Sequence, residues 1–338
     1  MEQRKTYKIP HGKMLVFADL HLTNRTRGRH KDYEVESKET MDIIEGIVAD
    51  EKPKTIVFLG DIIGYSDTVL KHGDFFTRVL GFFMNLNRMT EGRVFTVKGN
   101  HDIAPTTDFD TLTGVGLLKN PQYLDSDNVR YHFVNYGDEK EPIQLAVRKD
   151  INGENQIANI VFGHNDFAID NQTTWYQTED PLYVSTLTNL SGVRMIVSGH
   201  IHMTSEDLIE TEIDGNRVDV YYPGSICRVA SNDHHEVCSY LCFDYSGDSD
   251  RVSVEIEELS LRPLSDILED KPEDEQTAEE IEESVNKESI KDVVNMLSQR
   301  RLRKTDIFDQ IESLPEALFS ERGKKYTKKV ITEQKNRA

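Results

Sequence analysis

The chain has 338 residues, of which 37% are hydrophobic and 30% charged, and this length favours one large domain with a smaller appendage. It has no apolar run that could span a membrane, no apolar secretory segment at Met1–Pro10 and only three cysteines, so we expect a cytoplasmic protein without disulfides. The net charge of −20 excludes a uniformly basic nucleic-acid-binding surface, although a local patch or bound divalent ions would still admit a phosphate-bearing partner.

Five short apolar runs are typical of strands that are buried on both faces. They are Met14–Phe17, Thr55–Leu59, Val94–Val97, Ile160–Phe162 and Met195–Val197. Between the first three, the apolar spacing predicts helices, including one over Glu36–Ala49. Alternating strands and helices indicate an α/β fold with a layered core.

The second half of the chain favours a hairpin and then further strands. A turn at Asp214–Gly215 separates two alternating runs, Ile209–Ile213 and Val218–Tyr222. More strands are expected near Val237–Tyr245 and Val252–Leu259. This main domain is predicted to span residues 1–263.

The remaining chain changes in composition. Residues 264–283 are strongly acidic and predict a solvated linker. Residues 284–338 are basic and keep helical apolar spacing, which predicts a C-terminal helical appendage or a weakly ordered basic tail.

Each of the five apolar runs is followed at once by potential metal ligands. These are Asp19, His21, Asp61, Asn100, His164, His200 and His202. Ligands in α/β folds bind beyond the carboxyl ends of strands, so we expect these side chains to converge. Carboxylate and imidazole suit manganese, iron or zinc, and one carboxylate can bridge two ions about 3.5–4 Å apart. The sequence therefore predicts a two-metal centre that hydrolyses phosphoesters, with Asp61 as the bridge.

The set D-x-H, G-D, G-N-H-D, G-H and G-H-x-H, between Met14 and Ser225, closely resembles the calcineurin-like metallophosphoesterase superfamily. The resemblance implies a layered α/β/β/α sandwich. It assigns one divalent ion to Asp19, His21, Asp61 and His202, and the other to Asp61, Asn100, His164 and His200. It also implies that His101 is catalytic, protonating the leaving group or stabilising the transition state, and that Asp102 orients His101.

Within the superfamily, the run Tyr222-Pro223-Gly224-Ser225, followed by Arg228, is similar to SbcD-type DNA repair and recombination nucleases, above all bacteriophage versions. This implies manganese-dependent cleavage of DNA and a coiled-coil ATPase partner of the SbcC type, which would bind the C-terminal region at residues 284–338. Some members carry a second catalytic histidine three residues after the bridging aspartate, where this chain has Gly64.

Several alternatives stay open. The apolar helix expected around Phe75–Leu86 is either buried within the monomer or, as in the SbcD family, part of a homodimer interface. Arg25, Arg27 and Arg29 either hold DNA phosphates or form a solvated loop. The competing functions are a stand-alone phosphoesterase for small molecules or RNA ends, and a metal-free scaffold; the intact ligand set argues against the scaffold.

Overall fold

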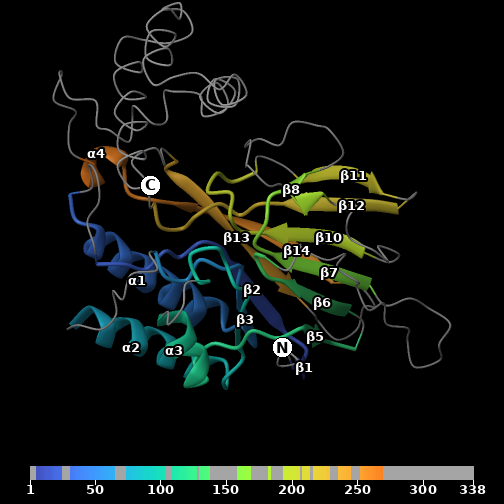
Figure 1. Ribbon diagram of the computed structural model, residues 1–338, viewed down its shortest axis with the longest axis horizontal. Helices are drawn as coiled ribbons and strands as arrows, with labels where there is room; N and C mark the ends of the chain where they lie inside the picture. Colours follow the sequence, from blue (N-terminus) through green and yellow to red (C-terminus); the bar gives the residue numbers. More distant parts are fainter. Residues whose placement is uncertain are drawn as a thin grey trace, which may run out of the picture. The chain divides into compact units, whose positions relative to one another are not determined.

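Figure 1 shows the computed structural model of the chain. It describes residues 5–24, 31–64, 74–103, 108–127, 129–137, 158–168, 182–183, 193–205, 208–213, 216–228, 235–244 and 252–268. The chain divides into two units, residues 1–269 and 270–338, and all described residues belong to the first. The predicted C-terminal region at 284–338, most of the predicted linker, and Arg25, Arg27 and Arg29 lie outside the described residues.

A five-stranded sheet contains the first three predicted strands. Its members are β2 (Lys13–Phe17), β3 (Thr55–Phe58), β4 (Val94–Thr96), β13 (Val237–Asp244) and β14 (Ser253–Ser260), in the order β14-β13-β2-β3-β4. Strands β2, β3 and β4 are parallel, whereas β13 runs antiparallel to both β2 and β14. The C-terminal part of the domain therefore extends a sheet that the N-terminal part begins.

A seven-stranded mixed sheet contains the other two. Its members are β1 (Thr6–Lys8), β5 (Tyr123–Asp125), β6 (Val129–Val134), β7 (Ala158–Gly163), β10 (Val193–Ser198), β12 (Asn216–Tyr221) and β11 (Ile209–Ile213), in the order β1-β5-β6-β7-β10-β12-β11. Strands β11 and β12 pair antiparallel, which confirms the predicted hairpin strands. A short pair, β8 (Phe167–Ala168) and β9 (Leu182–Tyr183), lies outside both sheets.

The two sheets pack face to face, and alternation along each strand decides which layer a side chain joins. In β2, Met14 and Val16 join a cluster shared with the seven-stranded sheet, which supplies Phe162 and Val197 among others. The alternate residue Leu15 instead packs under the helices. This division confirms the mixed α/β sandwich.

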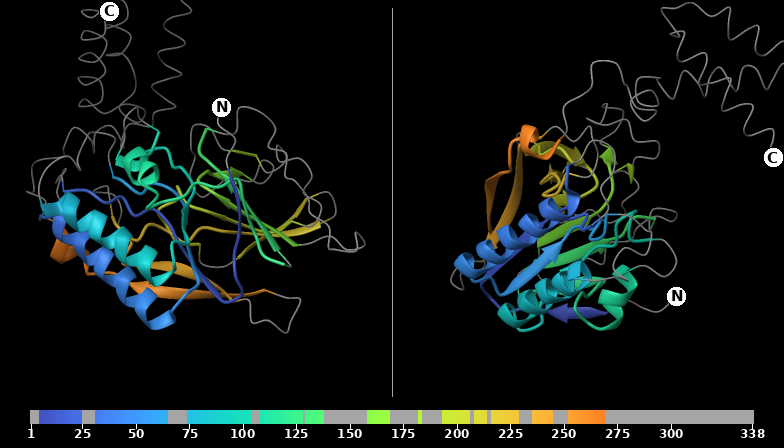
Figure 2. Two further views of the ribbon diagram at one scale, coloured as in Figure 1. Left: turned by 90° about the horizontal axis from the view of Figure 1, so that it is seen from below. Right: turned by 90° about the vertical axis from the view of Figure 1, so that its left-hand side faces the viewer.

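Helices cover the other face of the five-stranded sheet (Figure 2). They are α1 (Tyr33–Glu51), α2 (Asp74–Met89) and α3 (Asp108–Gly114); α4 (Leu264–Ile267) is a single turn at the end of the described chain. Residues of α2 such as Phe75, Val79 and Phe82 are buried in this layer, so burial within the monomer accounts for most of its apolar character. Among the described helices, none is both long and apolar enough to cross a membrane.

Two details refine the sequence interpretation. The five ligand-bearing strands do not share one sheet edge: three lie in the five-stranded sheet and two in the seven-stranded sheet. In addition, packed chain continues past Pro263, because Ile267 and Leu268 are buried and Ile267 accepts a backbone hydrogen bond from Lys31. The first residues of the predicted linker thus belong to the domain.

Candidate metal centre

The site lies where the carboxyl ends of strands from both sheets meet. Asp19 and His21 follow β2, Asp61 follows β3, and Asn100 follows β4. His164 directly follows β7, whereas His200 and His202 follow β10. The structure thus brings all seven predicted ligands to one place.

Tight turns make this convergence possible. Asp19, His21, Asp61 and His200 all have positive φ angles, of 47°, 44°, 45° and 82°, in the left-handed region that side chains with a Cβ seldom adopt. Such conformations persist when the surrounding structure holds them, and they cluster at functional sites. The structure around the site, and not the intrinsic preference of these residues, therefore determines their backbone conformation.

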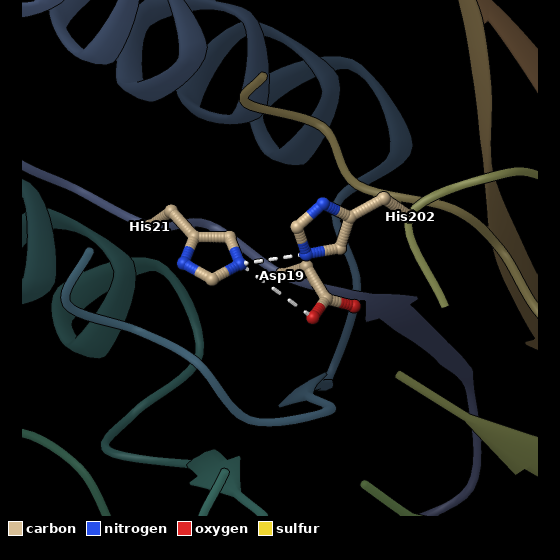
Figure 3. Close-up of side chains that lie close together, drawn as sticks. All are labelled: Asp19, His21 and His202. Carbon is tan, nitrogen blue, oxygen red and sulfur yellow. Dashed lines mark hydrogen bonds and ion pairs between the residues drawn. The ribbon is translucent and has the colours of Figure 1, made fainter. Parts of the chain in front are cut away.

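The first ligand group consists of Asp19, His21 and His202, whose side chains point toward one another in Figure 3. Nε2 of His21 lies 3.1 Å from Nε2 of His202 and 3.8 Å from Oδ1 of Asp19. Asp19 and His21 are fully buried. Two ring nitrogens and a carboxylate that face one shared point form a ligand set for a cation.

The second group consists of Asn100, His164 and His200. Oδ1 of Asn100 lies 3.0 Å from Nε2 of His164 and 3.2 Å from Nδ1 of His200. The Nδ1–H of His164 donates to the carbonyl of Leu59 at 2.6 Å, which turns Nε2 toward the site. Such a backbone partner on the far ring nitrogen is typical of metal-binding histidines.

The carboxylate of Asp61 stands between the two groups. Its Oδ2 lies 3.3 Å from Nε2 of His164 and 3.5 Å from Nε2 of His21. Its Oδ1 accepts the backbone N–H of His101 at 2.9 Å. This position agrees with the bridging role expected for Asp61.

The buried charges depend strongly on one another. Burial raises the pKa of Asp19 to about 6, even though His164 and His202 oppose this shift. Burial alone would lower the pKa of His164, but Asp61 and Asp19 raise it to about 10. Burial would raise the pKa of Asp61, yet His164, His21 and His101 lower it instead. The carboxylates of Asp61 and Asp19 therefore stabilise positive charge on His164, and they would stabilise a bound cation in the same way.

The donor chemistry fits divalent metal ions. Carboxylate, amide oxygen and imidazole are the ligands that manganese, iron and zinc share, and no described cysteine competes for the site. Three overlapping groups of carboxylate and imidazole side chains lie within ligand distance of one another, and Asp61 belongs to two of them. The geometry therefore supports a centre for two divalent ions.

His101 lies at the open side of this centre. Its side chain is 30% exposed, and its Nε2 lies 3.9 Å from Oδ2 of Asp61. Its ring meets that of His21 edge-on, with centroids 5.0 Å apart. An imidazole beside the ligands and open to solvent is placed to meet a bound substrate.

Asp102, the residue after His101, is buried and accepts hydrogen bonds from the backbone of the site. Its Oδ1 accepts the backbone N–H of Ile62 at 3.2 Å, and its Oδ2 accepts that of Gly99 at 2.9 Å. Burial, followed by the charge of Asp61, raises the pKa of Asp102 to about 8. These bonds tie the Asp61 turn to the Asn100 turn; the predicted orientation of His101 by Asp102 stays a prediction.

Two serines support the site through bonds that were not predicted from the sequence, although Ser225 belongs to the run that resembles SbcD-type nucleases. Ser225 donates its hydroxyl to the carbonyl of Asp19 at 2.9 Å, and its N–H donates to the carbonyl of His202 at 2.9 Å. Ser198 accepts the N–H of Asn165 at 2.9 Å and donates to its carbonyl at 2.8 Å, which fastens the turn after His164. Hydroxyls bonded to backbone leave no spacing pattern in a sequence.

Tyr136 was also missed. Its ring lies 5.7 Å from the ring of His200 and 6.4 Å from that of His164, measured between centroids. It follows β6, a strand that the sequence interpretation did not include. The only local signal is an aromatic residue before the turn at Gly137, which has a φ of 85°.

A family model described as calcineurin-like phosphoesterase matches residues 12–204, more than half of the chain. The chain belongs to the calcineurin-like phosphoesterase family. The matched range of the phosphoesterase contains all seven predicted ligands together with His101 and Asp102. The family and the side-chain geometry thus agree on a metal-dependent phosphoester hydrolase.

Other comparisons add little to this. A crystal structure of a dimetal phosphatase from Danio rerio is similar to the phosphoesterase with 12% identity and a TM-score of 0.43, covering 75% of this chain and 99% of that chain. That similarity is too low to carry an argument. No curated protein sequence matches the chain.

Proposed function

We propose that this phosphoesterase is a two-metal phosphodiesterase, the nuclease subunit of an SbcD-type complex that acts on DNA in repair, recombination or replication. The observation that carries the hydrolytic part is the pair of ligand groups that share Asp61, with His101 beside them. Two bound divalent ions, with manganese as our choice, would activate water and neutralise charge on the phosphoryl group. His101 protonates the leaving oxygen.

The DNA part of the proposal draws support from the segment that resembles SbcD-type nucleases. This segment returns to the metal centre, where Ser225 bonds the backbone of Asp19 and of His202. The segment is fixed from behind by Arg228, whose Nε donates to Oε1 of Glu36 at 2.9 Å. Arg228 is buried, so it supports the fold of the segment and does not contact substrate.

The proposed partners follow from the same resemblance. A coiled-coil ATPase of the SbcC type would bind the C-terminal region, and the chain would form a homodimer through α2. On α2, Met84 is 60% exposed and Met89 is 40% exposed, which leaves apolar surface for a second copy. A monomeric mass at micromolar concentration would count against the dimer.

Cleavage of labelled DNA in the presence of manganese tests the nuclease function. We expect metal-dependent cleavage that is lost in Asp61→Asn, whereas an exposed-site control, Asp127→Asn, keeps it. The opposite result is a protein that hydrolyses a chromogenic phosphodiester but cleaves no DNA, even with the ATPase present. That result would reject the nuclease proposal and leave the phosphodiesterase proposal standing.

One observation favours a second candidate, a phosphoesterase for small molecules. The net charge of −20 repels a polyanion such as DNA at long range, whereas a small substrate carries less charge. DNA cleavage that weakens steeply as salt rises would argue against this candidate, because it would reveal contacts between phosphates and local positive charge.

A further inference from the structure

Tyr136 lies beside one of the two ligand groups. Its ring is tilted 43° against that of His200 at 5.7 Å and stands near-perpendicular to that of His164 at 6.4 Å. The residue is half-buried, whereas His164 beneath it is fully buried. The ring therefore lies against the two histidines of the Asn100, His164 and His200 group, and the residue that carries it is partly open to solvent.

The position of Tyr136 is fixed by the loop that carries catalytic groups. The backbone N–H of Tyr136 donates to the carbonyl of Lys98 at 2.9 Å. The N–H of Lys98 in turn donates to Oδ1 of Asn135 at 2.8 Å, and this oxygen also accepts from Nδ2 of Asn120 at 2.8 Å. Lys98 directly precedes Gly99 and Asn100, so the ring and the metal ligands are held by one framework.

An apolar side chain extends this surface. Ile103 is 44% exposed and follows His101 by two residues. A Cβ added to Gly137 would lie 3.9 Å from Cδ1 of Ile103, so Ile103 lies close to the backbone next to Tyr136. An exposed isoleucine thus lies next to the backbone that carries the tyrosine ring beside the metal centre.

His101 and Tyr136 lie beside different ligand groups. The ring of His101 packs against His21 of the first group, whereas the ring of Tyr136 packs against His200 of the second. A phosphodiester carries two organic groups: one leaves as its oxygen takes a proton, and the other stays on phosphorus. If His101 protonates the leaving group, the surface at Tyr136 can contact the organic group that remains on phosphorus.

We propose that Tyr136, with Ile103 beside it, is a specificity-determining residue that holds the non-leaving organic group of a phosphodiester and so selects diesters over monoesters. This inference deepens the proposed phosphodiesterase function and rests on it. An aromatic ring stacks on a nucleobase and packs on a sugar. A monoester presents an anionic oxygen instead, and the electron-rich face of a tyrosine ring offers that oxygen no neutralising charge.

The test compares three variants with the wild type. Tyr136→Phe keeps the ring, and Tyr136→Leu keeps apolar bulk without it. Tyr123→Leu is the matched control, because Tyr123 is also half-buried but packs on His132 and Arg130. With manganese, kcat/KM is measured for bis(p-nitrophenyl) phosphate and for p-nitrophenyl phosphate. Metal content is measured for each variant.

In Tyr136→Leu we expect the diester-to-monoester ratio of kcat/KM to fall about tenfold through a higher KM for the diester, since stacking on one ring is worth roughly that factor. Tyr136→Phe and Tyr123→Leu keep the wild-type ratio, and all variants keep their metal. An unchanged ratio in Tyr136→Leu would overturn the inference. Loss of metal in that variant would also overturn it, because Tyr136 would then be a structural support.

A binding measurement separates this inference from the proposed activity. Calorimetry with calcium-loaded protein and a thymidine dinucleotide phosphorothioate should give about tenfold weaker binding in Tyr136→Leu. Wild-type protein that binds the dinucleotide but hydrolyses no diester would reject the proposed function, and the Tyr136→Leu affinity would still decide the inference. Wild-type protein that neither binds the dinucleotide nor hydrolyses the diester would overturn both.

Discussion

Oδ2 of Asp61 lies 3.3 Å from Nε2 of His164, so a residue that follows a strand of the five-stranded sheet contacts one that follows a strand of the seven-stranded sheet. The same oxygen lies 3.5 Å from Nε2 of His21 in the first ligand group. One carboxylate oxygen therefore lies beside both groups, where the bridging role predicted for Asp61 requires it.

Replacing Asp61 with asparagine should weaken both metal sites together. The amide is neutral and cannot supply the negative charge that two cations share, so manganese affinity should fall by at least on the order of 100-fold. Metal content after dialysis measures the effect. A variant that retains two ions per chain would show that Asp61 does not bridge.

Gly99→Ala should disturb the site without unfolding the protein. A Cβ at this position would collide with both the carboxylate and the backbone nitrogen of Asp61, so the turn that carries Asp61 must move. We expect weaker manganese binding by calorimetry, with an unchanged circular dichroism spectrum. Gly46→Ala is the control, because nothing lies within 4 Å of its added Cβ; Gly46 lies within α1, so alanine there should raise stability by about 0.5–1 kcal/mol.

His101→Ala should separate metal binding from catalysis. His101 is partly exposed and lies outside the two ligand groups assigned here, so both ions should stay bound. Loss of a proton donor typically slows a reaction by about 100-fold to 10,000-fold. Single-turnover cleavage of a phosphodiester measures the step, and activity equal to wild type would refute the catalytic role.

Ser225→Ala should lower stability and metal affinity together. The variant removes the hydroxyl that donates to the carbonyl of Asp19 in a fully buried position. A buried carbonyl that loses its donor costs about 1–3 kcal/mol, measurable by urea unfolding of metal-free protein. Manganese binding should weaken as the Asp19 turn relaxes. Ser253→Ala on the exposed strand β14 should change neither quantity.

His132 should make stability depend on pH away from the metal centre. Burial lowers the pKa of His132 to about 4, and its Nε2 bonds Oδ1 of Asn159 at 2.8 Å. The unfolded chain takes up a proton below its ordinary pKa of about 6.5, and the folded chain does so only near 4. The contribution of His132 to the free energy of unfolding is therefore fully present above pH 6.5, and it is lost as the pH falls toward 4.

The size of this effect follows from linkage. Between pH 7 and pH 5 the wild type should lose about 2 kcal/mol more unfolding free energy than His132→Gln. Urea unfolding at both pH values measures the difference between the two proteins, in which contributions from other groups cancel. Parallel losses in both proteins would show that His132 is not the source.

The sequence predicted the strands that carry ligands because their signals are local. Thr55–Leu59 is a continuous apolar run that ends in Gly60 and Asp61, and β3 is found at Thr55–Phe58. Glu36–Ala49 likewise lies inside α1. In these segments burial on both faces, or helical spacing, fixed the assignment without any knowledge of tertiary contacts.

The division into two sheets could not be predicted in this way. The pairing of β13 with β2 joins Leu241 to Val16, and no pattern within either strand specifies its partner. Tyr136 escaped notice for a similar reason, since its role depends on a contact with His200 that only the packing of β6 creates. Residues that act through distant neighbours leave little trace in composition or spacing.

The contact between Asp19 and His200 has a consequence for the molecule as a whole. Both oxygens of Asp19, beyond β2, accept the backbone N–H of His200, beyond β10, at 3.1 Å. Cations held here would therefore add a cross-link between two sheets that already meet through this polar contact and through buried apolar side chains. Metal binding would then raise the free energy of unfolding of the whole domain, so the protein without metal would be less stable than the metal-bound protein.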